Sequence, residues 1–146
     1  NEVRLMNAYF VTCTGYDVDE DGNVTCVYAT YDPESRGGNS PDGRKVRGTI
    51  HWVSAKTAKK AEIRLYENIV DEEKGVYNED GSINVNPNSL TVIKEAYVEP
   101  ELEKYDKGDS FQFMRTGYFC LDSKDSTKEH MVFNRIVSLK SSYKPN

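Results

Sequence analysis

The residues with the clearest chemical capability lie in the stretch from 111 to 127. A polar amide, Gln112, and a guanidinium, Arg115, are set here among aromatic side chains. Glutamine and arginine are well suited to reading nucleobase edges through paired hydrogen bonds. Because side chains alternate along a strand, Gln112 is expected on the opposite face from Phe111 and Phe113. Such a position is typical of an amide that faces solvent or a ligand.

The residues alone also allow a simpler interpretation, in which these are surface polar groups opposite a core face. The chain has ten Tyr, five Phe and one Trp, and most are expected to pack in a core or on a sheet face. A minority would be free to stack on bases. A further basic candidate, Arg4, is expected on the same strand face as Met6.

The elements that must position these groups are predicted to be strands. Short runs rich in Val, Ile, Tyr and Thr are separated by turns, which indicates an all-β barrel or sandwich. Strands are expected over residues 2–18, 24–31, 46–53, 61–70, 90–98, 109–115, 118–122 and 131–140.

The segments between the strands carry turn and loop signals. A polar loop with glycines and prolines runs over 32–45, and a second loop over 71–87 has a hairpin tip at Asp80 and Gly81. One helical turn capped by Ser54 is expected at 54–60, and a short helix at 100–104.

The first hairpin turn, at Asp21 and Gly22, has an acidic run that resembles the start of a calcium loop. The twelfth position, which needs a bidentate glutamate, is Tyr28, so an acidic surface turn is the preferred interpretation. With a two-residue loop, Cys13 would oppose Thr30 and Cys26 would oppose Asp17. The two thiols are then too far apart for a disulfide, and reduced cysteines are expected.

Composition limits the function classes that this chain can serve. The net charge of −5 argues against bulk binding of nucleic acid, which depends on clustered Lys and Arg. Neither a metal-ligand signature nor a nucleophile motif is present, so no catalytic residue and no metal ligand is predicted. Apolar runs are too short for a membrane span, and no membrane partner is expected.

Several segments taken in order closely resemble one protein family. Residues 46–55 resemble the Gly-x-Ile-His-Trp-Val-Ser segment of glutaminyl-tRNA synthetases, which are class I aminoacyl-tRNA synthetases. Further resembling segments are 2–9, 42–45, 64–66, 111–113, 117–122, 125–127 and 132–135. The resemblance covers nearly the whole chain and points to the C-terminal anticodon-binding region of a bacterial-type enzyme, cut free of its catalytic domain.

The resemblance implies an all-β fold of β-barrels like that of ribosomal protein L25. Residues 1 to about 55 would form mainly the distal barrel. Residues from about 56 to 140 would form mainly the segment that returns into the proximal barrel. It also implies that Arg4 contacts the first anticodon base, that Gln112 hydrogen-bonds the central uridine, and that Arg115 lies close beside it. Met6 departs from an arginine found in some family members. The cationic contact near the first base is then either lost or supplied elsewhere, by Arg44, Lys45 or Arg47.

The implied function is recognition of the tRNA(Gln) anticodon loop. The parent enzyme would join glutamine to tRNA(Gln) with ATP and magnesium in the cytoplasm, while this fragment, which needs no cofactor of its own, would not aminoacylate. The catalytic domain of the parent chain is a further expected partner. Two alternatives remain open: the related glutamyl enzyme of archaeal–eukaryotic type, and a β domain that binds protein rather than RNA.

Overall fold

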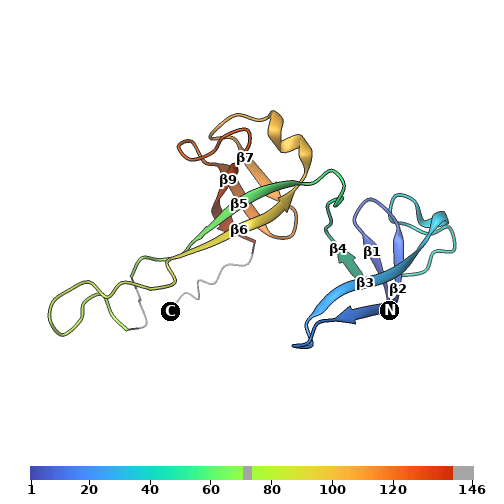
Figure 1. Cartoon of the computed structure of the whole chain (residues 1–146), viewed down its shortest axis with the longest axis horizontal. Helices are drawn as coiled ribbons and strands as arrows, with labels where there is room; N and C mark the ends of the chain where they lie inside the picture. Colours follow the sequence, from blue (N-terminus) through green and yellow to red (C-terminus); the bar gives the residue numbers. More distant parts are fainter. Residues whose placement is uncertain (71–73, 140–146) are drawn as a thin grey trace. The chain divides into compact units, whose positions relative to one another are not determined.

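The computed structural model describes residues 1–70 and 74–139, which fall into two compact units. One unit is Asn1–Trp52 and the other is Val53–Asn146 (Figure 1). Across the described ranges the regular structure is nine strands and two short 3-10 helices, so the all-β prediction is confirmed. The division into distal and proximal barrels stays a prediction, and its residues 71–73 and 140 lie outside the described part.

The first unit is a four-stranded sheet in the order β3-β2-β1-β4. Neighbouring strands are antiparallel, except that β4 runs parallel to β1. The sheet is an open ladder with β3 and β4 at its edges. Its strands are β1 (Glu2–Leu5), β2 (Phe10–Val18), β3 (Val24–Asp32) and β4 (Gly48–Ile50).

A tight turn interrupts the strand that the sequence predicts over 2–18. Leu5 N donates to Tyr9 O at 2.9 Å, and Asn7 adopts a φ of 57°. Asparagine is one of the few residues other than glycine that tolerates this conformation. Met6 therefore lies beyond the end of β1, and the expectation that it shares a strand face with Arg4 was wrong.

The hairpin between β2 and β3 has a longer loop than expected. Asp19 N donates to Asn23 O at 2.9 Å and Gly22, with a φ of 83°, donates to Asp19 O at 3.1 Å, which leaves three residues in the loop. Cys26 pairs with Asp17 as predicted, but a bulge shifts Cys13 opposite Ala29 instead of Thr30. Both thiols are free.

The second unit is a five-stranded sheet in the order β6-β5-β9-β8-β7. Its first and last strands in this order, β6 and β7, are the open edges. β5 and β9 run parallel, while the other neighbours are antiparallel. The strands are β5 (Lys59–Tyr66), β6 (Leu90–Val98), β7 (Ser110–Phe113), β8 (Gly117–Leu121) and β9 (Met131–Ser138).

The core of this unit lies on one face of the sheet and contains a group of packed phenylalanine rings. Phe119 and Phe133 are 1% and 0% exposed. The Phe113 ring stacks on Phe119 at 4.6 Å between centroids and meets Phe133 edge-on at 5.2 Å. The aliphatic and sulfur side chains buried with them are Ala61, Ile63, Val98, Leu102, Leu121 and Met131.

Three predicted connections can be compared directly with the structure. The segment expected as a helical turn at 54–60 is instead a turn at 55–57 followed by the start of β5, and the carbonyl of Ser54, not its side chain, accepts from Thr57 N and Ala58 N. The short helix at 100–104 is confirmed as the 3-10 helix η2 (Pro100–Lys104). The hairpin tip at Asp80 and Gly81 is confirmed, because Gly81 N donates to Asn78 O with a φ of 81°.

Residues 71–73, part of the loop predicted over 71–87, lie outside the described residues, as does residue 140 at the end of the predicted last strand. In the ranges 1–70 and 74–139, no helix has the length and apolar character that a membrane crossing requires.

Replacement of Gly117 by alanine is expected to destabilise the second unit. A Cβ at this position would lie 2.7 Å from the backbone oxygen of Val137, which cannot move aside as a side chain would. We expect the Gly117→Ala variant to lose about 1–3 kcal/mol of unfolding free energy in urea denaturation followed by circular dichroism. The matched control is Gly15→Ala on β2, where the nearest atom to a Cβ is at 3.8 Å. An equal loss in both variants would contradict the packing argument.

Candidate nucleic-acid interface

Four of the six predicted RNA-contact residues line one open hollow in the first unit. Arg4, Arg44, Lys45 and Arg47 surround a cavity of about 580 Å³. The other lining residues are Asn39, Ser40, Gly43 and Val46, so no carboxylate belongs to the lining. A hollow with cationic walls is suited to an anionic ligand even on a chain of net negative charge.

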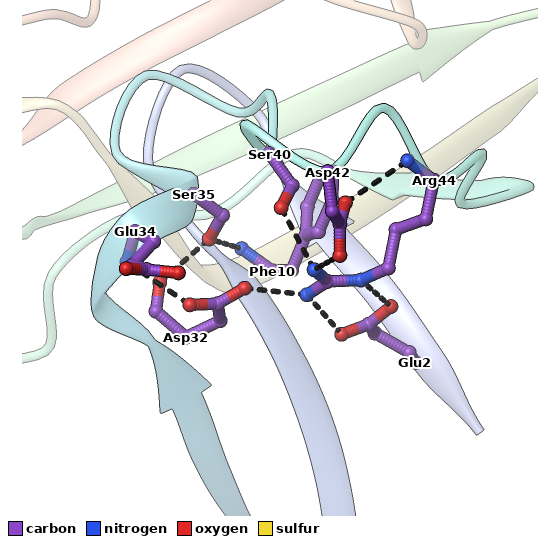
Figure 2. A network of polar contacts seen from close by, with 8 residues as sticks. All are labelled: Glu2, Phe10, Asp32, Glu34, Ser35, Ser40, Asp42 and Arg44. Atoms are coloured by element: carbon purple, nitrogen blue, oxygen red, sulfur yellow. Dashed lines mark hydrogen bonds and ion pairs between the residues drawn. The ribbon is translucent and has the colours of Figure 1, made fainter.

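The Arg44 guanidinium uses all five of its N–H donors within the unit (Figure 2). Nε and Nη2 donate to the two oxygens of Glu2 at 3.0 and 2.9 Å, a bidentate arrangement. Nη2 also donates to Asp32. Nη1 donates to Ser40 Oγ at 2.7 Å and to Asp42 Oδ2 at 2.6 Å. Arg44 thus ties the loop that follows β3 back to β1 and to the end of β3.

The charges of this network reinforce one another. Hydrogen bonds from Arg44 hold the pKa of Glu2 and of Asp32 below their usual values. The backbone N–H of Arg44, followed by its side chain, lowers the pKa of Asp42 to about 2. In turn the hydrogen bond to Glu2, with those to Asp32 and Asp42, raises the pKa of Arg44. The guanidinium is therefore neutralised by its own unit, and the prediction that it contacts RNA stays untested.

Arg4 is held beside Arg44 by a shared aromatic ring. The guanidinium carbons of Arg4 and Arg44 lie 5.2 and 5.0 Å from the ring centroid of Phe10, which is 1% exposed. Gly38, at a φ of 87°, lets the backbone approach, because a Cβ there would lie 3.3 Å from Arg4 Cδ. Arg4 Nε is buried and has no hydrogen-bond partner in the described part of the chain. An unused buried donor of this kind would gain from an acceptor.

The loop that carries the hollow is anchored through a buried serine in the 3-10 helix η1 (Pro33–Ser35). Ser35 Oγ accepts from Phe10 N at 2.7 Å and donates to Asp32 O at 2.6 Å. Gly37 N donates to Ala8 O at 2.7 Å. The polar loop predicted over 32–45 is therefore fixed at its start to β2 and to the turn after β1.

Lys45 and Arg47 are the available cations of the hollow. Both side chains are exposed, and neither makes an ion pair with any residue in the ranges 1–70 and 74–139. They lie two residues apart in the irregular segment that leads into β4, and both line the hollow.

The remaining two predicted residues, Gln112 and Arg115, belong to the second unit. Gln112 is exposed on β7, and its neighbours Phe111 and Phe113 pack against the core cluster on the other face, as predicted. Arg115 is exposed in the turn between β7 and β8 with a φ of 66°. Thr116 N closes this turn by donating to Phe113 O at 2.9 Å.

Tyr118 is a neighbour of Gln112 that was not among the predicted site residues. Tyr118 on β8 pairs directly with Gln112 and is 42% exposed. The hairpin register contained the signal, because a loop of three residues between Phe113 and Gly117 places residue 118 opposite residue 112.

The acidic segment after β8 serves the fold of the second unit. Asp122 Oδ1 accepts from Lys124 N and Asp125 N at 2.8 and 2.6 Å, and Asp122 Oδ2 accepts from Asn134. The backbone hydrogen bond from Asp125 is the main cause that lowers the pKa of Asp122. Arg64 bridges Glu62 and Asp125. Within the described ranges no group of three or more His, Cys, Asp or Glu side chains is arranged to hold a metal.

Comparison with known proteins defines the class to which these features belong. Residues 49–122 match the family model described as the anti-codon binding domain of class I tRNA synthetases (E and Q). The match covers half of the chain, from β4 to the end of β8, and the chain therefore belongs to this family of anticodon-binding domains.

Named relatives narrow the similarity further. The chain is 55% identical over 146 residues to the glutamine–tRNA ligase of Clostridium kluyveri, which covers 99% of the chain and 26% of the relative. It is 49% identical over 150 residues to that of Clostridioides difficile and 47% identical over 143 residues to that of Vibrio vulnificus, covering 99% and 98% of the chain. In each case the chain spans about a quarter of the relative's length.

Replacement of Arg44 is expected to remove an acid-sensitive part of the stability. Carboxylates with lowered pKa values stabilise the fold above their ordinary values of 3.8 to 4.5, and this contribution is lost as the pH falls towards about 2. We expect the urea midpoint of the wild-type chain to fall over this range, and the Arg44→Ala and Arg44→Lys midpoints to be lower at neutral pH and to fall less. Lysine lacks the planar fork that binds several carboxylates at once.

The matched control for this experiment is Arg47→Ala, which removes a cation without an ion-pair partner among the described residues. We expect its urea midpoint to follow the wild-type curve at each pH. Identical curves for the Arg44 and Arg47 variants would contradict the tethering role of Arg44.

Proposed function

We propose that this chain is the anticodon-reading part of a glutamine–tRNA ligase. The observation that carries the proposal is the cationic hollow, in which Arg4, Lys45 and Arg47 face an open cavity with no carboxylate in its lining. Single-stranded RNA is supported as its ligand by the family match over residues 49–122 and by relatives that cover nearly the whole chain, the hollow included. Glutamine specificity is supported by the relatives, whose printed names are glutamine–tRNA ligase.

The two units offer complementary chemistry for such a ligand. Lys45 and Arg47 supply cations for phosphate oxygens, which position an RNA but carry no sequence information. Gln112 supplies one donor group and one acceptor group on an exposed strand face, which suits the Watson–Crick edge of an unstacked base. Arg115, at the tip of the same hairpin, adds a planar guanidinium. We therefore assign recognition of the base to Gln112 and Arg115. The hollow is assigned the attraction of the RNA phosphate backbone.

The rest of the activity is proposed to reside in the parent enzyme. Joining glutamine to tRNA(Gln) requires ATP and magnesium, and we assign both to a catalytic domain outside this chain. We also assign the first unit to the distal barrel and the second to the proximal barrel, and the parent to the cytoplasm. The family match and the relatives make a glutamyl-type enzyme or a protein-binding β domain the less favoured interpretations.

Replacement of Gln112 is expected to reduce discrimination at the central anticodon base. A good bidentate contact is worth about 1–3 kcal/mol, so the preference for the cognate uridine should fall roughly 5- to 150-fold in Gln112→Ala. Fluorescence anisotropy with a tRNA(Gln) anticodon stem-loop and its central-base variants measures this preference. Nuclear magnetic resonance titration of the 16.6 kDa chain covers the case of weak binding.

The matched control is Ser110→Ala, which alters another exposed residue of β7 two positions earlier. We expect it to leave both affinity and discrimination unchanged. Equal affinity of the wild-type chain for cognate and central-base variants, at a salt concentration where it binds, would refute base reading by this chain.

Neutralising the hollow is expected to change the salt dependence of binding instead. Each phosphate contact to single-stranded nucleic acid contributes about 0.7 to the slope of log K against log salt concentration. The Lys45→Ala and Arg47→Ala variants should weaken binding of all stem-loops equally and reduce the slope by about that amount each. A change in base preference without a change in slope would contradict the division of roles.

A further inference from the structure

An exposed row of side chains crosses the face of the second sheet that is opposite its core. Gln112 on β7 pairs with Tyr118 on β8, and Tyr118 pairs with Val137 on β9. Tyr118 is 42% exposed and Val137 is 51% exposed. Paired residues on neighbouring antiparallel strands have Cβ atoms about 5 Å apart and point to the same side of the sheet. The amide, the phenol ring and the valine therefore form one continuous strip.

The exposed strip and the hydrophobic core lie on opposite faces of the sheet. Along β8 the residues on either side of Tyr118 are buried, Gly117 and Phe119, so the strand alternates strictly between the core and the exposed face. The core face is already filled by the rings of Phe111 and Phe113, each of which contacts the Phe133 ring. Tyr118 thus keeps an aromatic ring on the outer face without contributing to that packing.

We propose that Tyr118 is a stacking platform for the unpaired nucleobase whose edge Gln112 reads. Recognition of single-stranded RNA typically combines a hydrogen-bonding side chain at the base edge with an aromatic ring under the base. Gln112 provides the first and Tyr118 the second, from directly paired positions. Val137 extends the apolar surface beyond the ring. This inference rests on the proposed function. It assigns to Tyr118 the role of holding the base in place, whereas Gln112 distinguishes one base from another.

Charge supports a nucleotide as the occupant of this strip. Arg115 lies in the turn that joins the two strands, three residues from Gln112 and three from Tyr118, and its side chain is exposed. It has no ion-pair partner in the described part of the chain. A cation at the end of an aromatic and amide strip matches a base attached to a phosphodiester, which an apolar peptide side chain would not require.

The test compares ring-retaining and ring-removing variants of the 146-residue chain. Binding of the tRNA(Gln) anticodon stem-loop is measured for Tyr118→Phe, Tyr118→Leu and the control Tyr97→Leu, an exposed tyrosine of β6 in the same sheet. We expect Tyr118→Leu to weaken binding roughly 5- to 100-fold, and Tyr118→Phe and Tyr97→Leu to stay within about twofold of the wild type. Thermal unfolding monitors the fold of each variant.

Stacking and edge reading are separated by base dependence. Because every base has a π face, Tyr118→Leu should weaken all central-base variants of the stem-loop by a similar factor, whereas Gln112→Ala changes their ranking. As a readout independent of affinity, a stem-loop with 5-iodouridine at the central position should photocrosslink to the peptide that contains Tyr118, and not to that peptide in Tyr118→Leu.

Each outcome has a distinct meaning. Wild-type binding that Tyr118→Leu leaves intact, or a crosslink located elsewhere, overturns the stacking role while the proposed function stands. Equal losses in Tyr118→Phe and Tyr118→Leu overturn it as well, because the ring would then not be the contact. If the wild-type chain fails to bind the stem-loop even in the magnetic resonance titration, both the proposed function and this inference fall.

Discussion

The first unit depends on a single guanidinium whose hydrogen-bonding capacity is completely used. Arg44 connects Glu2 on the first strand, Asp32 at the end of the third and Asp42 in the loop that follows the third strand. This unit has little apolar interior, since Phe10 is its one buried large hydrophobic side chain among the described residues. Electrostatic cross-linking therefore takes over a task that a hydrophobic core performs in larger domains. As a consequence, the Arg44 guanidinium, which lines the hollow, is already paired with carboxylates of its own unit.

The second unit is held together in a different way, by an aromatic cluster on one face of its sheet. The Phe113 ring contacts those of Phe119 and Phe133 at centroid distances of 4.6 and 5.2 Å. Ion pairs such as Arg64 with Glu62 and Asp125 involve β5 residues that alternate with the core residues of that strand. The two units thus present their polar chemistry from scaffolds with different sensitivity to salt and pH, because dispersion and burial respond to neither as strongly as charge pairs do.

Much of this architecture was predictable from the sequence, because alternation and turn residues act locally. The sequence pattern alone predicted the strand at 90–98 and the short helix at 100–104. It also predicted that Gln112 faces away from the core. The failures arise where an irregular backbone, or contacts between distant residues, override simple alternation. A bulge shifted Cys13 by one pairing position, and a turn stabilised by Asn7 ended the first strand early. The engagement of Arg44 could not be predicted either, because its partners at positions 2 and 32 are distant in sequence and are brought together only by the sheet.

The alternation of side chains along β7 couples packing of the core to exposure of the recognition residue Gln112. Phe111 and Phe113 face the core because they occupy alternate positions of the strand, and Gln112 is exposed because it lies between them. A shift of one residue in the pairing register of this strand would exchange the faces, burying the amide and exposing both rings. Length variation in this hairpin is therefore confined to its turn or to steps of two residues. A change in recognition here must come from substitution at a fixed register rather than from remodelling of the strand.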